Sequence, residues 1–132
     1  MKALIAINNL KTNTEARIRG VLPESMSVQQ WMVIDTLCNV DKPTAGQVAD
    51  STAILGPSMA RIIRDLKEQG LIKSRPCTAD KRALRLSVTT DGGKLYRKYK
   101  TRVTKAMQVK HEDLNQIACI ISDQYGIDRG ES

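Results

Sequence analysis

Residues 44–70 contain the pattern that restricts the fold of this chain most strongly. Thr44 is followed three positions later by Gln47, a capping box that satisfies two backbone N–H groups at the start of a helix. This helix must be short, because Pro57 follows soon after and suits the first turn of a second helix. The sequence therefore predicts two helices joined by a tight turn, and Gly70 ends the second one.

The second helix has one apolar face and one polar, basic face. Its apolar residues recur at spacings of three and four, which predicts a helix buried on one side: Met59, Ile62, Ile63 and Leu66. The other face carries small, polar and basic residues, among them Ser58, Arg61 and Arg64. A helix with such a free face fits the major groove of DNA.

The residues after this helix predict a two-stranded ribbon. Residues 71–75 and 84–88 are short runs with rough alternation of apolar and polar residues. The loop between them, residues 76–83, is mostly polar and carries Asp80 and two basic residues. A helix-turn-helix followed by a ribbon with a basic tip is a winged helix.

These residues resemble the MarR family of bacterial transcription regulators. The resemblance rests on Ser58-x-x-Arg61 and Leu66-x-x-x-Gly70-Leu71-Ile72 around the second helix, and on Asp80-x-Arg82-Ala83 and Val88-Thr89-x-x-Gly92 around the ribbon. It covers residues 58–92, and the rest of the chain matches the family by its helical pattern alone. The resemblance implies a mainly α fold with a small two- or three-stranded β wing, that is, a winged helix-turn-helix with terminal dimerisation helices.

The resemblance also implies how the chain is organised. A winged helix-turn-helix region spans residues 23–90, and residues 1–22 and 91–132 form a helical dimerisation region, all within a single compact domain. In the family the first and the last two helices pack around a two-fold axis. Both chain ends carry apolar residues that a monomer would leave exposed: Leu4, Ile7, Ile117 and Ile121. The pattern near the C-terminus predicts a break at residues 111–113 before the last helix.

The net charge of +7 is concentrated where the winged helix would meet DNA. Residues 57–108 carry 14 basic and 4 acidic residues, a net charge of +10. Residues 1–20 have a net charge of +3, and residues 21–56 and 109–132 have −3 each. A basic face alone is as often merely solvated, but its coincidence with a helix-turn-helix favours phosphate binding.

Several other classes of protein are disfavoured. No apolar run approaches the roughly 20 residues that span a bilayer, and the N-terminal stretch becomes polar too early for a secretory signal. Three widely spaced cysteines form neither a disulfide framework nor a zinc motif, so we expect a cytoplasmic chain without metal or cofactor. We expect no enzyme, because no catalytic grouping is visible. An aromatic content of 3% disfavours RNA binding by base stacking.

The resemblance assigns DNA contact and effector binding to separate sets of residues. The predicted DNA-binding residues are Thr44, Ser51, Pro57, Ser58, Ala60, Arg61, Arg64, Arg75, Asp80, Lys81 and Arg82. The predicted effector-binding residues are Arg17, Trp31 and Cys38, near where the family's first, second and fifth helices meet the winged helix. For these three, ordinary alternatives stay open: a core position for Trp31 and Cys38, and a solvated surface for Arg17.

A finer resemblance concerns the effector. Gln29-Gln30-Trp31 together with Ala53-Ile54-Leu55-x-Pro57-Ser58 resembles the homoprotocatechuate-regulator branch, although Gly56 departs from it. This implies a small aromatic acid or its thioester as effector.

The resulting prediction is a homodimeric, ligand-responsive repressor that binds a pseudo-palindromic operator. Effector binding would change the spacing of the two recognition helices by shifting the population of conformers. Two alternatives remain. One is a thiol-based redox sensor of the same fold using Cys77, whose pKa the neighbouring Lys73 and Arg75 would lower. The other is a winged-helix protein-interaction module that does not bind DNA.

Overall fold

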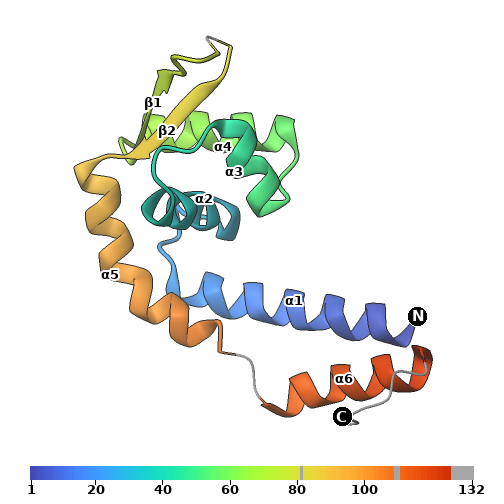
Figure 1. Cartoon of the computed structure of the whole chain (residues 1–132). Helices are drawn as coiled ribbons and strands as arrows, with labels where there is room; N and C mark the ends of the chain where they lie inside the picture. The colour runs from blue at the N-terminus through green and yellow to red at the C-terminus, as the bar shows by residue number, and fades with distance from the viewer. Residues whose placement is uncertain (81, 109–110, 126–132) are drawn as a thin grey trace. The chain divides into compact units, whose positions relative to one another are not determined.

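A computed structural model describes residues 1–80, 82–108 and 111–125 of the chain. Within these ranges the chain forms six helices and one two-stranded antiparallel sheet (Figure 1). The predicted fold class, mainly α with a small β wing, is confirmed, and the wing has two strands. The elements in order are α1 (Lys2–Val21), α2 (Val28–Asn39), α3 (Ala45–Thr52), α4 (Gly56–Glu68), β1 (Ile72–Pro76), β2 (Leu84–Val88), α5 (Thr90–Ala106) and α6 (His111–Tyr125).

The chain packs into two compact units. The terminal unit consists of Met1–Val21 and Arg102–Ser132, and the winged-helix unit consists of Leu22–Thr101. The winged-helix unit extends past residue 90 into α5, because α5 packs against α2 there. The rings of Trp31 and Tyr96 make this contact, stacked with centroids 5.2 Å apart.

Two helices of the winged-helix unit, α2 and α3, begin at capping boxes. Ser27 Oγ accepts from the Gln30 backbone N–H at 3.1 Å, and the Gln30 side chain accepts from the Ser27 backbone N–H at 3.0 Å. Thr44 and Gln47 form the same pair of hydrogen bonds at the start of α3. Each box satisfies N–H groups that the first turn of a helix leaves without partners.

The turn after α4 uses a glycine for its backbone conformation. Gly70 has a φ of +73°, a left-handed conformation that residues with a side chain seldom adopt. The chain then enters β1, which pairs with β2 from Ile72 opposite Val88 to Pro76 opposite Leu84. The ribbon therefore lies one residue further along at its first strand than the sequence pattern predicted.

The core of the winged-helix unit lies between its helices and the sheet. Its innermost side chains come from α2, α3, α4 and β2 and have no exposed surface: Val33, Ile34, Val48, Leu66 and Leu86. The four residues predicted for the apolar face of α4 are all buried. Their burial fixes which side of α4 is left free.

In the terminal unit, α1 packs against α6. The predicted break at residues 111–113 is wrong, since these residues form the start of α6. Two of the three are acidic, and acidic residues are favourable at the positive end of a helix dipole. No helix of the described residues is both long and apolar enough to cross a membrane.

Candidate nucleic-acid interface

The exposed face of α4 carries the predicted recognition residues. Pro57, Ser58, Ala60, Arg61 and Arg64 are all exposed. The Arg64 Nε lies 3.9 Å from Asp65 Oδ1, a loose ion pair on the surface. Arg61 has no hydrogen-bond or ion-pair partner among the described residues. Its guanidinium is therefore available for an external ligand.

The turn between α3 and α4 completes this face. Ala53 has a φ of +56°, so a residue with a side chain takes the left-handed conformation that ends α3. Leu55 follows and exposes 76% of its surface just before α4. Neither residue was in the predicted set. Of the two residues predicted from α3, Ser51 is exposed, whereas the Thr44 hydroxyl accepts the capping hydrogen bond and is half-buried.

The wing, residues 72–88, ends in a loop held by its own backbone. The Cys77 N–H donates to the Ala83 carbonyl at 2.8 Å, and the Ala83 N–H donates to the Asp80 carbonyl at 3.0 Å. The Asp80 carboxylate accepts from the Arg82 backbone N–H at 3.0 Å. Asp80 thus fixes the backbone of Arg82.

Two of the three predicted wing cations are among the described residues. Arg75 on β1 and Arg82 near the tip are exposed. Lys81 lies outside the described residues.

The wing also contains Cys77, which is only 5% exposed. Backbone N–H groups of Asp80 and then Ala79 lower the pKa of the Cys77 thiol, burial opposes them, and the Arg85 side chain adds to the lowering.

Arg85 is a residue that the sequence analysis missed. Its Nη1 donates to the Lys42 carbonyl at 2.9 Å, 43 positions away in the chain. The sequence pointed to Lys73 and Arg75 as the cations that lower the pKa of Cys77, but Arg85 is the cation that contributes to the lowering. No local pattern indicates a contact over such a separation.

Trp31 and Cys38, two of the predicted effector residues, lie in the winged-helix unit. Trp31 is buried against Tyr96, with an angle of 21° between the rings. Cys38 is half-buried, and burial, followed by the negative charge of Asp35, raises the pKa of its thiol. Cys38 also lines a hollow of about 400 Å³ together with Lys42 and Ser87.

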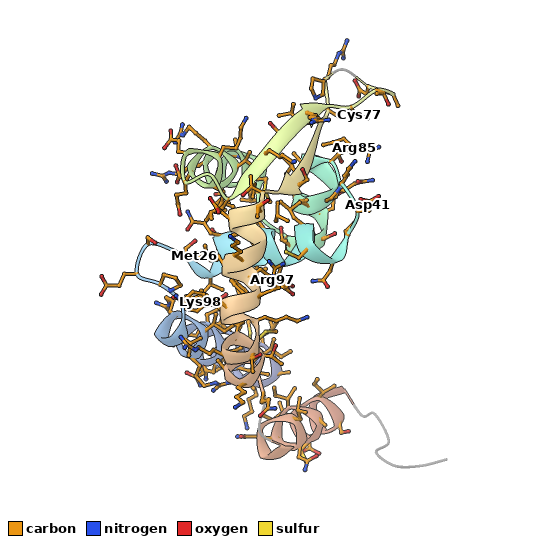
Figure 2. The ribbon with its side chains drawn as sticks, turned by 90° about the vertical axis from the view of Figure 1, so that its left-hand side faces the viewer. Met26, Asp41, Cys77, Arg85, Arg97 and Lys98 are labelled. Atoms are coloured by element: carbon orange, nitrogen blue, oxygen red, sulfur yellow. The ribbon has the colours of Figure 1, made fainter. Side chains whose placement is uncertain are left out.

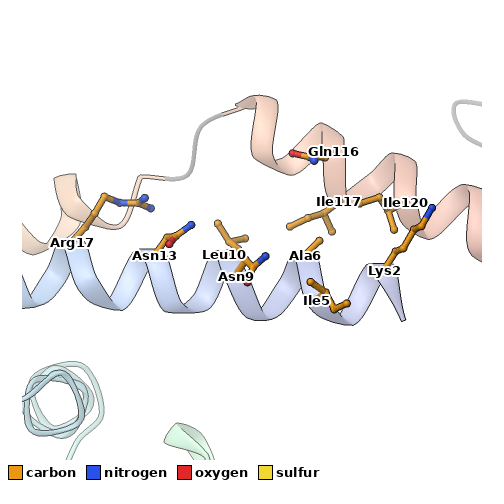
Figure 3. A pocket seen from close by; sticks show the side chains of 10 residues that line it. All are labelled: Lys2, Ile5, Ala6, Asn9, Leu10, Asn13, Arg17, Gln116, Ile117 and Ile120. Atoms are coloured by element: carbon orange, nitrogen blue, oxygen red, sulfur yellow. The ribbon is translucent and has the colours of Figure 1, made fainter.

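The third predicted effector residue, Arg17, lies in the terminal unit. Its Nε donates to the carbonyl of Ala106, the last residue of α5, at 3.0 Å, and Nη2 donates to Thr14 Oγ1 at 3.2 Å. A cation at the carboxyl end of a helix is favourable. Figure 3 shows Arg17 at one end and Lys2 at the other end of a hollow of about 380 Å³ between α1 and α6.

No cluster of three or more potential metal ligands occurs within the described ranges. The winged-helix unit presents an exposed helix face, an exposed ribbon and exposed cations such as Arg61, Arg75 and Arg82.

Comparison with known proteins places this surface in a family. The model of the MarR family matches residues 25–83, which run from the turn before α2 to the tip of the wing. Over these residues the chain resembles the MarR family. The match ends at the wing, and α1, α5 and α6 lie outside it, so the resemblance rests on the helix-turn-helix and the wing loop.

One curated relative is an uncharacterized HTH-type transcriptional regulator of Mycobacterium leprae, 32% identical over 74 residues. The match covers 55% of this chain and 52% of the relative, so the chain spans about half the length of the curated relative that it matches.

Solved structures share the MarR fold over nearly the whole chain. The PcaV transcriptional regulator of Streptomyces coelicolor, in complex with its natural ligand, has a TM-score of 0.73 and 15% identity, covering 91% of this chain and 89% of its own. BpsR of Bordetella bronchiseptica, whose DNA binding is regulated by 6-hydroxynicotinic acid, has a TM-score of 0.72 and 19% identity, covering 92% and 91%. At these identities the likeness concerns the fold alone.

Proposed function

We propose that this chain is a ligand-responsive transcriptional repressor that binds a pseudo-palindromic DNA site as a homodimer. The observation that carries the proposal is the free face of α4. The buried residues of α4 fix its orientation, so Ser58, Arg61 and Arg64 all face outward. An α-helix fits the major groove, and arginine forms bidentate hydrogen bonds with guanine.

The wing supports the same proposal. Arg82 is exposed on a loop whose backbone is held by Asp80 and Cys77, in the same compact unit as α4. A ribbon of this kind reaches the minor groove, where narrow A·T tracts attract arginine. The net charge of +10 over residues 57–108 matches the phosphate backbone that such a surface meets.

The homodimer is supported by apolar surface on the terminal unit. On α1, Leu4 is 63%, Ile5 58% and Ile7 46% exposed. Large apolar side chains exposed so close together on one helix are typical of an interaction site. A two-fold dimer would present two copies of α4 to half-sites about 34–36 Å apart. Sedimentation of the free protein tests this state: the mass of a single chain at micromolar concentration would contradict it.

The effector we propose is a small aromatic acid. One support is that 6-hydroxynicotinic acid, an aromatic acid, regulates DNA binding by BpsR. The other is that cationic residues lie beside apolar ones in the hollows of both units of this chain. If a panel of aromatic carboxylates and thioesters leaves the protein–DNA complex intact, this part of the proposal fails.

The experiment for DNA binding starts from duplexes selected from a random pool. Arg61→Ala should lose about 1–3 kcal/mol on the selected duplex and less on a random one, because it reads a base. Arg82→Ala should lose a similar amount, mostly on duplexes with A·T-rich flanks. Arg19→Ala, a substitution on the exposed surface of α1, is the control and should bind like the wild type.

Two results would contradict the proposal. One is a selection that enriches no duplex, which would favour a protein-interaction module. The other is wild-type affinity for both Arg61→Ala and Arg82→Ala.

A further inference from the structure

Arg75 and Arg85 are directly opposite each other in the wing. They are cross-strand partners on β1 and β2, and both are exposed. Like charges at directly opposite positions destabilise a two-stranded ribbon. The two arginines nevertheless have different surroundings, which suggests different tasks.

The backbone of β2 is joined to residues 40–44, which we call the α2–α3 segment. The Leu86 N–H donates to the Pro43 carbonyl at 2.9 Å, and Arg85 forms an isolated antiparallel bridge with Thr44. Thr44 is also the N-cap of α3. The outer edge of β2 is therefore attached to the residue that begins the helix-turn-helix.

The Arg85 side chain extends this attachment. Its Nη1 donates to the carbonyl of Lys42, a residue with a φ of +44°. The Arg85 guanidinium also helps to lower the pKa of the Cys77 thiol, which directly follows β1. In Figure 2, Arg85 lies between Cys77 of the wing and Asp41 of the α2–α3 segment. A guanidinium carried by β2 of the wing thus contacts the α2–α3 segment across the junction between the wing and the helix-turn-helix.

We propose that Arg85 is a positioning residue that ties the wing to the α2–α3 segment and thereby holds Arg82 in place relative to α4. The proposal rests on the proposed DNA-binding function. A guanidinium supplies donors in a fixed, planar fork, so its hydrogen bond holds the Lys42 carbonyl in a defined geometry. The side chain of Arg75 has no hydrogen bond or ion pair with a described residue, so it would instead be free to contact phosphate.

The first arm of the test uses the free protein. Amide hydrogen exchange is compared for the wild type, Arg85→Gln and Arg75→Gln. We expect Arg85→Gln to raise exchange at Leu86, Cys77 and Ala83, whose N–H groups hold the junction and the loop, by about tenfold or more. Arg75→Gln should leave these amides unchanged. Unchanged exchange in Arg85→Gln, with intact thermal melting, would overturn the proposal.

The second arm uses a selected duplex over a range of salt concentrations. A lost phosphate contact reduces the log–log salt slope by about 0.9, whereas a lost positioning contact lowers affinity with little change of slope. We expect the first behaviour from Arg75→Gln and the second from Arg85→Gln. The Arg82→Ala/Arg85→Gln double variant should lose less affinity than the two single losses combined, because both act through Arg82. Additive losses with a reduced slope for Arg85→Gln would make Arg85 a phosphate contact instead.

The Arg85→Lys variant is the control for a folding defect. It keeps the charge but lacks the fork, so it should retain the wild-type salt slope and still show raised exchange. If Arg85→Lys and Arg85→Gln both exchange at the wild-type rate, the proposal that Arg85 ties the wing to the α2–α3 segment is overturned. If the wild-type protein binds no duplex, the proposed function fails. The hydrogen-exchange measurement then still decides whether Arg85 holds the wing.

Discussion

The Tyr96 hydroxyl joins α5 to α2 through polar contacts that accompany its ring stacking. It donates to Asp35 Oδ1 at 2.7 Å and accepts from Asn39 Nδ2 at 3.2 Å. Burial raises the pKa of Tyr96 above its ordinary value of 10.0, and the hydrogen bond to Asp35 adds to the rise. The native state therefore favours the neutral phenol.

The dependence of stability on pH follows from this rise. A folded-state pKa above the unfolded one stabilises the native state fully below pH 10, and this contribution is lost as pH rises through the folded pKa. Tyr96→Phe should cost about 1–3 kcal/mol near neutral pH, through the lost hydrogen bond to a carboxylate. The difference from the wild type should shrink above about pH 10. Denaturant unfolding at several pH values measures the difference in free energy of unfolding between the two proteins. A difference that stays constant up to about pH 11.5 would contradict the proposed role of Tyr96.

For single residues, the sequence predicted which side chains are exposed better than it predicted which residues contact each other. The helical period of α4 placed Arg61 on the free face and Ile62 in the core, as the structure has them. The roles of Tyr96 and Arg85 could not be predicted, because Asp35 and Lys42 lie 61 and 43 positions from them in the chain. Such pairs arise from the tertiary fold and leave no periodic signal.

The junction between β2 and α5 is an element that local patterns described only in part. Thr89 caps α5 by accepting from the Gly92 N–H at 3.1 Å, and its hydroxyl donates to the Gly70 carbonyl at 2.6 Å. The partners of the cap are three residues apart, a spacing that a local pattern can reveal. The approach of α5 to the turn after α4 leaves no such pattern, since Gly70 is 19 positions away.

The paired glycines at this junction should respond to substitution in opposite ways. A Cβ at Gly92 would overlap the Leu71 carbonyl, whereas a Cβ at Gly93 would meet only the mobile end of Arg97 at 3.4 Å. Gly92→Ala should destabilise the protein by about 1–3 kcal/mol through overpacking. Gly93→Ala, the matched control, should stabilise it by about 0.5–1 kcal/mol through helix propensity. Thermal melting of both variants tests this account, and equal shifts of the same sign would contradict it.

At the scale of the whole molecule, the chain carries two surfaces of different character in two compact units. The winged-helix unit exposes cations on α4 and the wing, and the terminal unit exposes apolar side chains on α1. The sequence predicted both surfaces, from the charge of residues 57–108 and from the apolar chain end. Residues 91–101, which the sequence grouped with the terminal helices, pack with α2 instead, because of Trp31 and Tyr96.

The salt dependence of binding to a selected duplex tests the central proposal, DNA binding through the basic surface, most directly. Each phosphate neutralised by a cation releases condensed counterions, so affinity falls with salt in proportion to the number of contacts. With about six phosphates neutralised per dimer, the slope of log K against log salt should be roughly −5. A slope near zero would contradict DNA binding by this surface.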